Sequence, residues 1–289
     1  MKTLIEIATA IKYILAIVVL SAITVGVKAQ TPKTGYAPVN GLKMYYEIHG
    51  TGRPLVLLHG AFMTVGLNYG QLIPELAKDR QVIAFEFQGH GHTADIDRAY
   101  SFDAFADDVA AAMKYLKIDS ADVFGYSMGG TVAFNLAVRH PEVVRKLIIA
   151  SSVAKPDGWS EATRNALTHI TADMFEPTPI KTEYDRTAPD PKHFNQFIEK
   201  MKVFIKTPYD FGMNNIKAIK SPTLLIFGDS DGVDPKHIVE LFALRNGWTN
   251  GDMAGPSKSQ LTIFPGTSHT GVMMQNELLV KSVVPFLGK

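Results

Sequence analysis

The sequence predicts an α/β protein with a mostly parallel central sheet, helices on both faces of the sheet, and a small helical cap insert. Short apolar runs alternate with longer amphipathic stretches along most of the chain. Several of these runs are apolar throughout, as expected for strands that are buried on both faces. The alternation stops at residues 152–215, where no clear strand can be recognised.

The first half of the chain contains most of the predicted strands. Apolar runs enriched in aromatic and β-branched residues predict strands, and spacings of three to four residues between apolar positions predict helices. Residues 31–38 are polar and contain proline, and are expected to form an irregular lead-in. The predicted elements that follow are strands at 42–48, 54–58, 81–87, 122–125 and 146–150, and helices at 72–78, 103–116 and 128–139.

The second half resumes the pattern after the insert, with strands predicted at 223–227 and 260–264 and helices at 235–245 and 276–286. The insert is broken by prolines and has two helix-like stretches, at 160–174 and 191–205. In the second stretch, aromatic and methionine residues recur every three or four positions. We expect most of them to pack the insert onto the main body and some to line a substrate cavity beneath it: Phe194, Phe197, Met201 and Phe204.

The N-terminal residues differ in composition from the rest of the chain and are considered separately. Residues 13–27 are uncharged and mostly aliphatic, and Val27-Lys28-Ala29 fits a signal-peptidase site. The run is shorter than the roughly 20 residues that a membrane-spanning helix needs. The sequence therefore predicts an export signal over residues 1–29, cleaved after Ala29, and a periplasmic or secreted protein with no stable membrane span. An uncleaved N-terminal membrane anchor is the alternative.

Composition excludes several classes of function. The 289 residues are 46% hydrophobic and 20% charged, which is typical of a folded chain long enough to bury its own core. Lys plus Arg total 29 against 28 for Asp plus Glu, and no basic run is interleaved with aromatic residues, so nucleic acid is not an expected partner. The absence of cysteine excludes disulfides, thiolate nucleophiles and cysteine-zinc sites.

One pentapeptide has the pattern that is typical of a serine nucleophile. Gly125-Tyr126-Ser127-Met128-Gly129 is a G-x-S-x-G motif that lies between a predicted strand and a predicted helix. The sharp turn needs neighbours with almost no side chain, which the two glycines provide. Ser127 would then lie at a helix N-terminus, where free N–H groups favour developing negative charge.

A serine nucleophile needs a base that takes its proton. His269 follows the last predicted strand, so it lies at the carboxyl edge of the sheet, as Ser127 does. His90 and His92 also follow a strand, but their glycine-rich turn favours a structural role. The other candidates, such as His237, are expected to be surface residues.

The base in turn needs an orienting carboxylate. Three aspartates follow the strand predicted at 223–227, namely Asp229, Asp231 and Asp234. Asp234 precedes Pro235 at a helix start, where capping is its natural role. Position in the sequence does not choose among the three.

Taken in order, these motifs resemble those of the α/β-hydrolase superfamily, in particular its single-chain serine esterase, haloperoxidase-like and lipase-like members. His59-Gly60 resembles the oxyanion loop of that family, and residues 86–93 resemble its D-x-R-G-x-G-x-S turn. The G-x-x-D segment that ends at Asp231 singles out this aspartate. Glu86 and Gln88 depart from the family pattern, which casts doubt on a local ion pair. Serine at position 127 argues against the haloalkane dehalogenase and epoxide hydrolase branches.

The resemblance implies an α/β-hydrolase fold over residues 30–289, with the insert at 152–215 in the position of the family's cap. It further implies a serine hydrolase that cleaves an ester or related acyl bond without a metal or cofactor. Ser127 would be the nucleophile, His269 the base and Asp231 the orienting acid. The backbone N–H groups of Ala61 and Met128 would bind the oxyanion. The aromatic and methionine content of the insert suggests a small-molecule substrate with an apolar acyl or alcohol group.

Two other hypotheses about the function involve the same residues. The first keeps the catalytic groups and changes the reaction, to C–C bond hydrolysis of a dienoic acid or to perhydrolysis with haloperoxidase-like activity. The second is a receptor that binds a ligand with slow turnover or none. The complete set of Ser127, Asp231 and His269 argues against the receptor.

Overall fold

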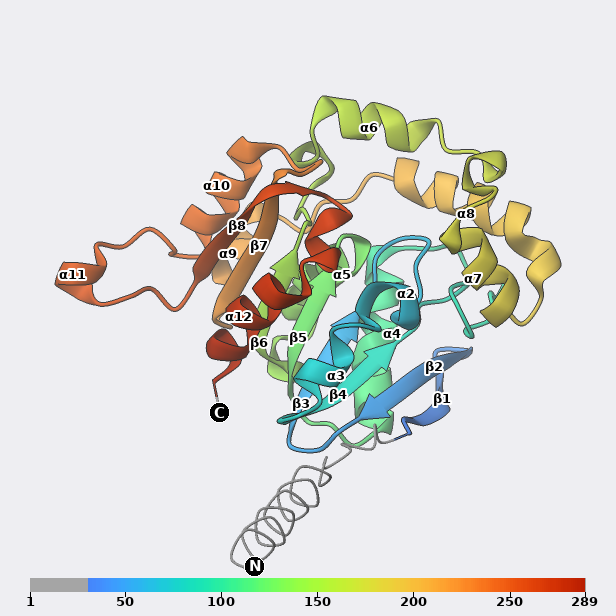
Figure 1. Cartoon of the computed structure of the whole chain (residues 1–289), viewed down its shortest axis with the longest axis horizontal. Helices are drawn as coiled ribbons and strands as arrows, with labels where there is room; N and C mark the ends of the chain where they lie inside the picture. The colour runs from blue at the N-terminus through green and yellow to red at the C-terminus, as the bar shows by residue number, and fades with distance from the viewer. Residues whose placement is uncertain (1–30, 289) are drawn as a thin grey trace, which may run out of the picture. The chain divides into compact units, whose positions relative to one another are not determined.

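A computed structural model describes residues 31–288, and its centre is a sheet of eight strands in the order β1-β2-β4-β3-β5-β6-β7-β8 (Figure 1). Only β2 runs antiparallel to its neighbours, and all other pairs of adjacent strands are parallel. This confirms the predicted mostly parallel sheet. The predicted export signal, 1–29, lies outside the described residues. The strands are β1 (Lys33–Val39), β2 (Leu42–His49), β3 (Arg53–Leu58), β4 (Arg80–Phe85), β5 (Ala121–Tyr126), β6 (Val144–Ala150), β7 (Thr223–Ser230) and β8 (Gln260–Ser268).

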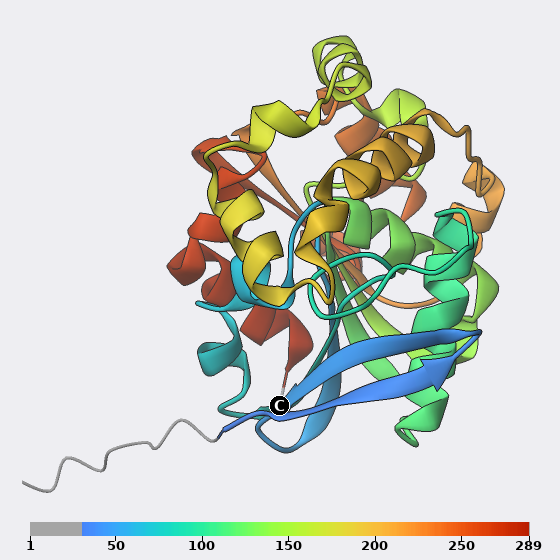
Figure 2. The same cartoon turned by 90° about the vertical axis from the view of Figure 1, so that its right-hand side faces the viewer.

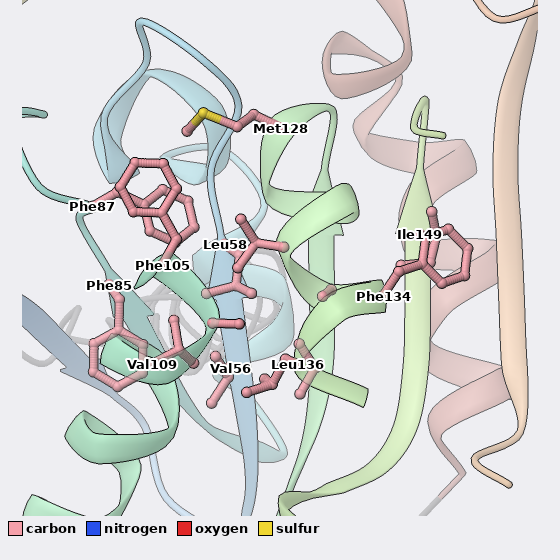
Figure 3. Close-up of a cluster of buried hydrophobic side chains, with 14 of the residues drawn as sticks. Val56, Leu58, Phe85, Phe87, Phe105, Val109, Met128, Phe134, Leu136 and Ile149 are labelled. Carbon is pink, nitrogen blue, oxygen red and sulfur yellow. The ribbon is translucent and has the colours of Figure 1, made fainter. Parts of the chain in front are cut away.

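Helices cover both faces of the sheet because successive side chains of each central strand point to opposite faces. In β3, Val56 and Leu58 belong to one buried cluster, whereas Leu55 and Leu57 belong to the other. Figure 3 shows part of the first cluster, where side chains of the strands meet those of the covering helices. The first face is covered by α4 (Phe102–Tyr115), α5 (Met128–Arg139) and α10 (Pro235–Leu244), and the second by α2 (Val65–Tyr69), α3 (Ile73–Leu76) and α12 (Asn276–Leu287).

The irregular lead-in predicted at 31–38 was wrong, because β1 pairs with β2 along its whole length. The strand lies at the edge of the sheet, where a proline such as Pro38 costs no ladder hydrogen bond toward a further strand. The signal that could have revealed the hairpin is Asn40-Gly41, which joins the two strands with φ of 46° and 82°. Asn-Gly is a favoured pair for tight hairpin turns that require positive φ.

Four helices separate β6 from β7: α6 (Glu161–Thr168), α7 (Pro179–Thr187), α8 (Phe194–Lys206) and α9 (Met213–Ala218). We call the first three the cap helices; both views show them gathered at one end of the sheet (Figure 1, Figure 2). Helix α7 is absent from the sequence prediction, because proline usually interrupts a helix. Pro179 instead occupies the first helical turn, where its missing N–H costs nothing, and Thr178 caps the helix.

The aromatic and methionine side chains of α8 do both things that their spacing predicts: they pack the insert onto the main body, and some of them line a cavity. Phe194, Phe197, Met201 and Phe204 are all buried in the cluster that α8 shares with the main body. Met201 and Phe204 also border the cavity described below. Among residues 31–288, none of the helices is long and apolar enough to cross a lipid bilayer.

Candidate active site

The turn that carries Ser127 is strained in the way its glycines predict. Ser127 has φ of 51° and ψ of −120°, a conformation that residues with a side chain rarely adopt. A Cβ on Gly125 would overlap the carbonyl group of Gly129, and a Cβ on Gly129 would overlap the carbonyl oxygen of Leu58. The chain can therefore reverse its direction between β5 and α5 without an intervening loop, and Ser127 lies at the apex of this turn.

His269 and Asp231 meet Ser127 at the carboxyl ends of β5, β7 and β8. Nε2 of His269 lies 3.0 Å from Oγ of Ser127. On the other side of the ring, Nδ1 lies 2.8 Å from Oδ1 of Asp231. The side chain of Asp231 is fully buried, whereas that of His269 is 29% exposed. The three residues singled out in the sequence thus form one hydrogen-bonded line from the buried carboxylate to the hydroxyl.

The charge of Asp231 fixes the direction of these hydrogen bonds. Burial alone would raise the pKa of Asp231, but the hydrogen bond with His269, together with that from the N–H of Gly228, holds the pKa below its ordinary value. The carboxylate can only accept, so Nδ1 of His269 carries the proton. Nε2 is then left as an acceptor facing the hydroxyl of Ser127.

The other two aspartates of the loop have structural partners. Asp229 accepts hydrogen bonds from the backbone N–H groups of Gly266 and Thr267, at 2.9 and 3.1 Å, and so ties β7 to the end of β8. Asp234 caps α10 by accepting from the N–H of Lys236 at 2.8 Å. Of the three candidates, Asp231 is the one that contacts His269.

Ala61 and Met128 both border the cavity that contains Ser127. The peptide groups on either side of Gly60, including the one that contains the N–H of Ala61, are each held by a side chain. Nδ1 of His59 donates to the carbonyl oxygen of Gly60 at 2.8 Å, and the N–H of Gly60 donates to Oδ1 of Asn68 at 2.7 Å. Because a trans peptide is planar, fixing the carbonyl of Gly60 aims the N–H of Ala61 in the opposite direction.

The histidines near this loop are structural, in line with the sequence interpretation of His90 and His92. His59 and His90 are buried side by side, with ring centroids 5.0 Å apart. Nε2 of His59 accepts from the N–H of Phe87 at 3.1 Å, so its proton is on Nδ1. Burial lowers the pKa of His59 well below its usual value and that of His90 to about 4, and both rings are neutral at neutral pH.

The turn at residues 86–93 is held by partners other than those of the family pattern. Glu86 accepts hydrogen bonds from the N–H of Val65 and from the N–H and ring of His92. The hydrogen bond that Glu86 accepts from the ring raises the pKa of His92, so a carboxylate–histidine contact of 2.9 Å occupies the place of the doubted ion pair. Gln88 donates to Asp95 and accepts from Arg98.

His237 was wrongly expected at the surface, since its side chain is only 3% exposed. Its Nε2 accepts from the N–H of Ala154 at 3.3 Å, and Nδ1 faces Glu240 at 2.9 Å. Position 237 falls on the inner side of α10, next to buried Ile238 and Leu241, and this periodicity was available in the sequence.

A cavity of about 400 Å³ opens above Ser127, which is the size of a small-molecule site. It lies between the turn, the cap helices α6 and α8, and Tyr209. Its walls are largely apolar, with Phe102, Trp159, Met201 and Phe204 among them. A larger cavity of about 670 Å³ lies beside α7 and α8, but neither Ser127 nor His269 borders it. Within the described part of the chain, no group of three or more metal-ligating side chains could hold a metal ion.

The comparison with known families agrees with this geometry. The model of the α/β hydrolase fold family matches residues 53–201, from β3 into α8. The chain belongs to the α/β hydrolase fold family. The match confirms the resemblance that the sequence motifs carried and includes the turn at Ser127.

Individual relatives of this α/β hydrolase differ in reaction. The 2-hydroxymuconate semialdehyde hydrolase of Pseudomonas sp. strain CF600 is 37% identical over 39% of the chain and 41% of its own length. The chain therefore spans less than half of that relative. The bifunctional esterase/perhydrolase of Acinetobacter calcoaceticus is 24% identical over 86% of the chain and 97% of its length.

Among solved structures, the meta-cleavage product hydrolase CumD of Pseudomonas fluorescens IP01 superposes with a TM-score of 0.69. The comparison covers 88% of the chain and 97% of CumD at 22% identity. This similarity supports the fold.

The buried His90 predicts a pH dependence of stability. The folded protein keeps His90 neutral down to about pH 4, whereas the unfolded chain takes up a proton below its ordinary pKa of about 6.5. Between these values the unfolded state binds more protons, so stability falls as the pH falls. We expect His90 alone to lower the free energy of unfolding by about 2–3 kcal/mol between pH 7 and pH 4.5.

Urea unfolding of the wild type and of His90→Asn at both pH values measures this effect. Asparagine can keep the hydrogen bond to the carbonyl of Gln88 but does not titrate. The loss of stability should be smaller in His90→Asn than in the wild type, while the exposed His193→Asn should match the wild type. His59 and Asp95, the titratable groups that act on His90, are unchanged in every protein compared. An equal loss in His90→Asn and the wild type would contradict the prediction.

Proposed function

We propose that this α/β hydrolase is a serine hydrolase that cleaves an ester or a related acyl bond through an acyl-enzyme. The observation that carries the proposal is the hydrogen-bonded line of Ser127, His269 and Asp231, which opens into a mostly apolar cavity. All the groups that the reaction needs are provided by this chain.

In the proposed mechanism, Oγ of Ser127 attacks the carbonyl carbon while Nε2 of His269 takes the hydroxyl proton. Asp231 keeps the proton of the ring on Nδ1 and stabilises the positive charge that forms on the imidazole. His269 then gives its proton to the departing alcohol. A water molecule, deprotonated by the same ring, hydrolyses the acyl-enzyme and returns Ser127 to its starting state.

The N–H groups of Ala61 and Met128 are the proposed donors to the tetrahedral oxyanion. Met128 is the first residue of α5, where N–H groups lack helical partners and the helix dipole favours negative charge. The N–H of Ala61 is aimed by the hydrogen bond from His59 to the carbonyl of the same peptide, and Asn68 holds the preceding peptide. One such donor contributes about 3 kcal/mol to the transition state in comparable enzymes, so this fixed placement matters as much as the nucleophile.

Hydrolysis of a C–C bond is a second candidate, favoured by the 37% identity to a 2-hydroxymuconate semialdehyde hydrolase. The esterase/perhydrolase relative supports perhydrolysis as a further variant. All three reactions would use the same residues. A substrate panel that includes esters, a dienoic acid and peracid formation separates them. Rapid labelling of Ser127 by a fluorophosphonate would exclude a binding protein without a reactive serine.

Replacing Ser127 with alanine should abolish the hydrolysis of a short p-nitrophenyl ester. Without the hydroxyl no acyl-enzyme forms, and kcat should fall by at least about 10⁴-fold. Steady-state kinetics and circular dichroism would measure activity and folding together. Ser230→Ala is the control, because Ser230 is an exposed serine at the end of β7. Turnover by a folded Ser127→Ala protein near the wild-type rate would refute the proposal.

The choice among the three aspartates can be tested directly. Asp231→Asn should lower kcat about 10⁴-fold, because asparagine cannot hold the ring in the required tautomer. Asp229→Asn is the matched control: it alters a neighbouring carboxylate that binds only backbone N–H groups and the Ser230 hydroxyl. It should lower stability more than kcat. If Asp229→Asn lost as much activity as Asp231→Asn, Asp231 would not be the orienting acid.

We also propose that residues 1–29 direct export and are removed after Ala29. Mass spectrometry of the protein recovered from cells would then give a mature N-terminus at Gln30. Mutation of Ala29 to a bulky residue, such as Ala29→Phe, should block processing and leave the uncleaved chain in the membrane fraction. A wild-type protein that keeps Met1 or its neighbours and remains in the membrane fraction would favour the uncleaved anchor.

A further inference from the structure

The cavity above Ser127 has an unbalanced charge. Two of the side chains that border it are cationic, Arg164 on α6 and Lys206 at the end of α8. No aspartate or glutamate is among the bordering residues. Apart from the ring of His269, the remaining walls are apolar or hydroxyl-bearing side chains, and none of them carries a negative charge.

Neither cation has a carboxylate partner anywhere in the described range 31–288. Nη1 of Arg164 donates to the carbonyl oxygens of Trp159 and Asp157, and the guanidinium has further donors on Nε and Nη2. The ammonium group of Lys206 makes no ion pair and no hydrogen bond within the same residues. By contrast, four other cations on the cap helices form ion pairs: Lys181, Arg186, Lys200 and Lys202.

We propose that the substrate of this hydrolase carries a carboxylate, which Arg164 and Lys206 bind while the scissile carbonyl lies at Ser127. The inference rests on the proposed function, since it places the reacting carbonyl at the hydroxyl. Two cations beside apolar walls favour an anion, because the guanidinium fork matches a carboxylate and no carboxylate of the cavity wall competes for it. The apolar side chains Phe102, Met201 and Phe204 would then contact the chain between the two groups.

Two pairs of esters test the proposal, because each pair differs by one charge at nearly constant shape. p-Nitrophenyl hemiadipate and its methyl ester place the charge on the acyl side. 4-Acetoxybenzoate and its methyl ester place it on the alcohol side. Because a hydrogen bond to a charged group is stronger than one to a neutral group, the wild type should favour the acid of at least one pair by about tenfold or more in kcat/KM, after subtraction of the spontaneous rate.

Variants then assign the preference to the two cations. Arg164→Gln and Lys206→Gln should each lower the acid-to-methyl-ester ratio several-fold, and the double variant should bring it near one. Lys202→Gln is the matched control, since Lys202 lies on α8, pairs with Glu199 and does not border the cavity. Lys206→Gln removes no ion pair or hydrogen bond among residues 31–288, so it keeps the test valid if Arg164→Gln weakens α6. Raising the salt concentration should lower the wild-type ratio, because both cations are partly open to solvent.

The outcomes separate this inference from the proposed function. A wild type that hydrolyses the neutral esters without favouring either acid would overturn the carboxylate site and leave the serine hydrolase standing. A preference that persists in the double variant would also overturn it, because other groups would then bind the charge. Loss of all hydrolysis, together with failure of Ser127 to react with a fluorophosphonate, would instead reject the proposed function.

Discussion

The hydrogen bond between Asp231 and Nδ1 of His269 is the interaction on which the geometry of the site depends. It is 2.8 Å long and ends on a carboxylate whose side chain is fully buried. A buried charge is tolerated only when it is paired or well hydrogen-bonded, so the carboxylate and the ring constrain each other. The ring is then oriented, and its second nitrogen lies within hydrogen-bonding distance of the Ser127 hydroxyl.

This convergence follows from the parallel sheet. Ser127, Asp231 and His269 are far apart in the chain, but each comes directly after the carboxyl end of a strand or at its last residues. Parallel strands bring those ends to one edge. The strained turn then positions the side chain of Ser127. Its φ of 51° is maintained by close packing of the chain, which only glycine permits at positions 125 and 129.

The fold and the site residues could be predicted because their signals are local. Apolar runs mark the central strands, and G-x-S-x-G marks the turn. Position alone could not separate Asp231 from Asp229, since the difference lies in which one faces a loop from another strand. The edge strand β1 and helix α7 escape the sequence prediction for a different reason. Proline disfavours the interior of strands and helices, whereas an edge strand and a first helical turn both accommodate it.

The cap and the site are physically joined, which bears on how substrate selection is coupled to chemistry. The N–H of Ser160 donates to the carbonyl of Gly232, and the N–H of Asp234 donates to the carbonyl of Gly158, so the start of the cap is bonded to the loop that carries Asp231. Trp159, between those bonds, packs edge-on against His269 at 5.4 Å. Arg164 in turn donates to the carbonyl of Trp159. Under the proposed function, a movement of α6 on binding a substrate would therefore reach the loop that holds Asp231 and one contact of the His269 ring, and the helix proposed to bind the substrate would be coupled to the residues proposed to act on it.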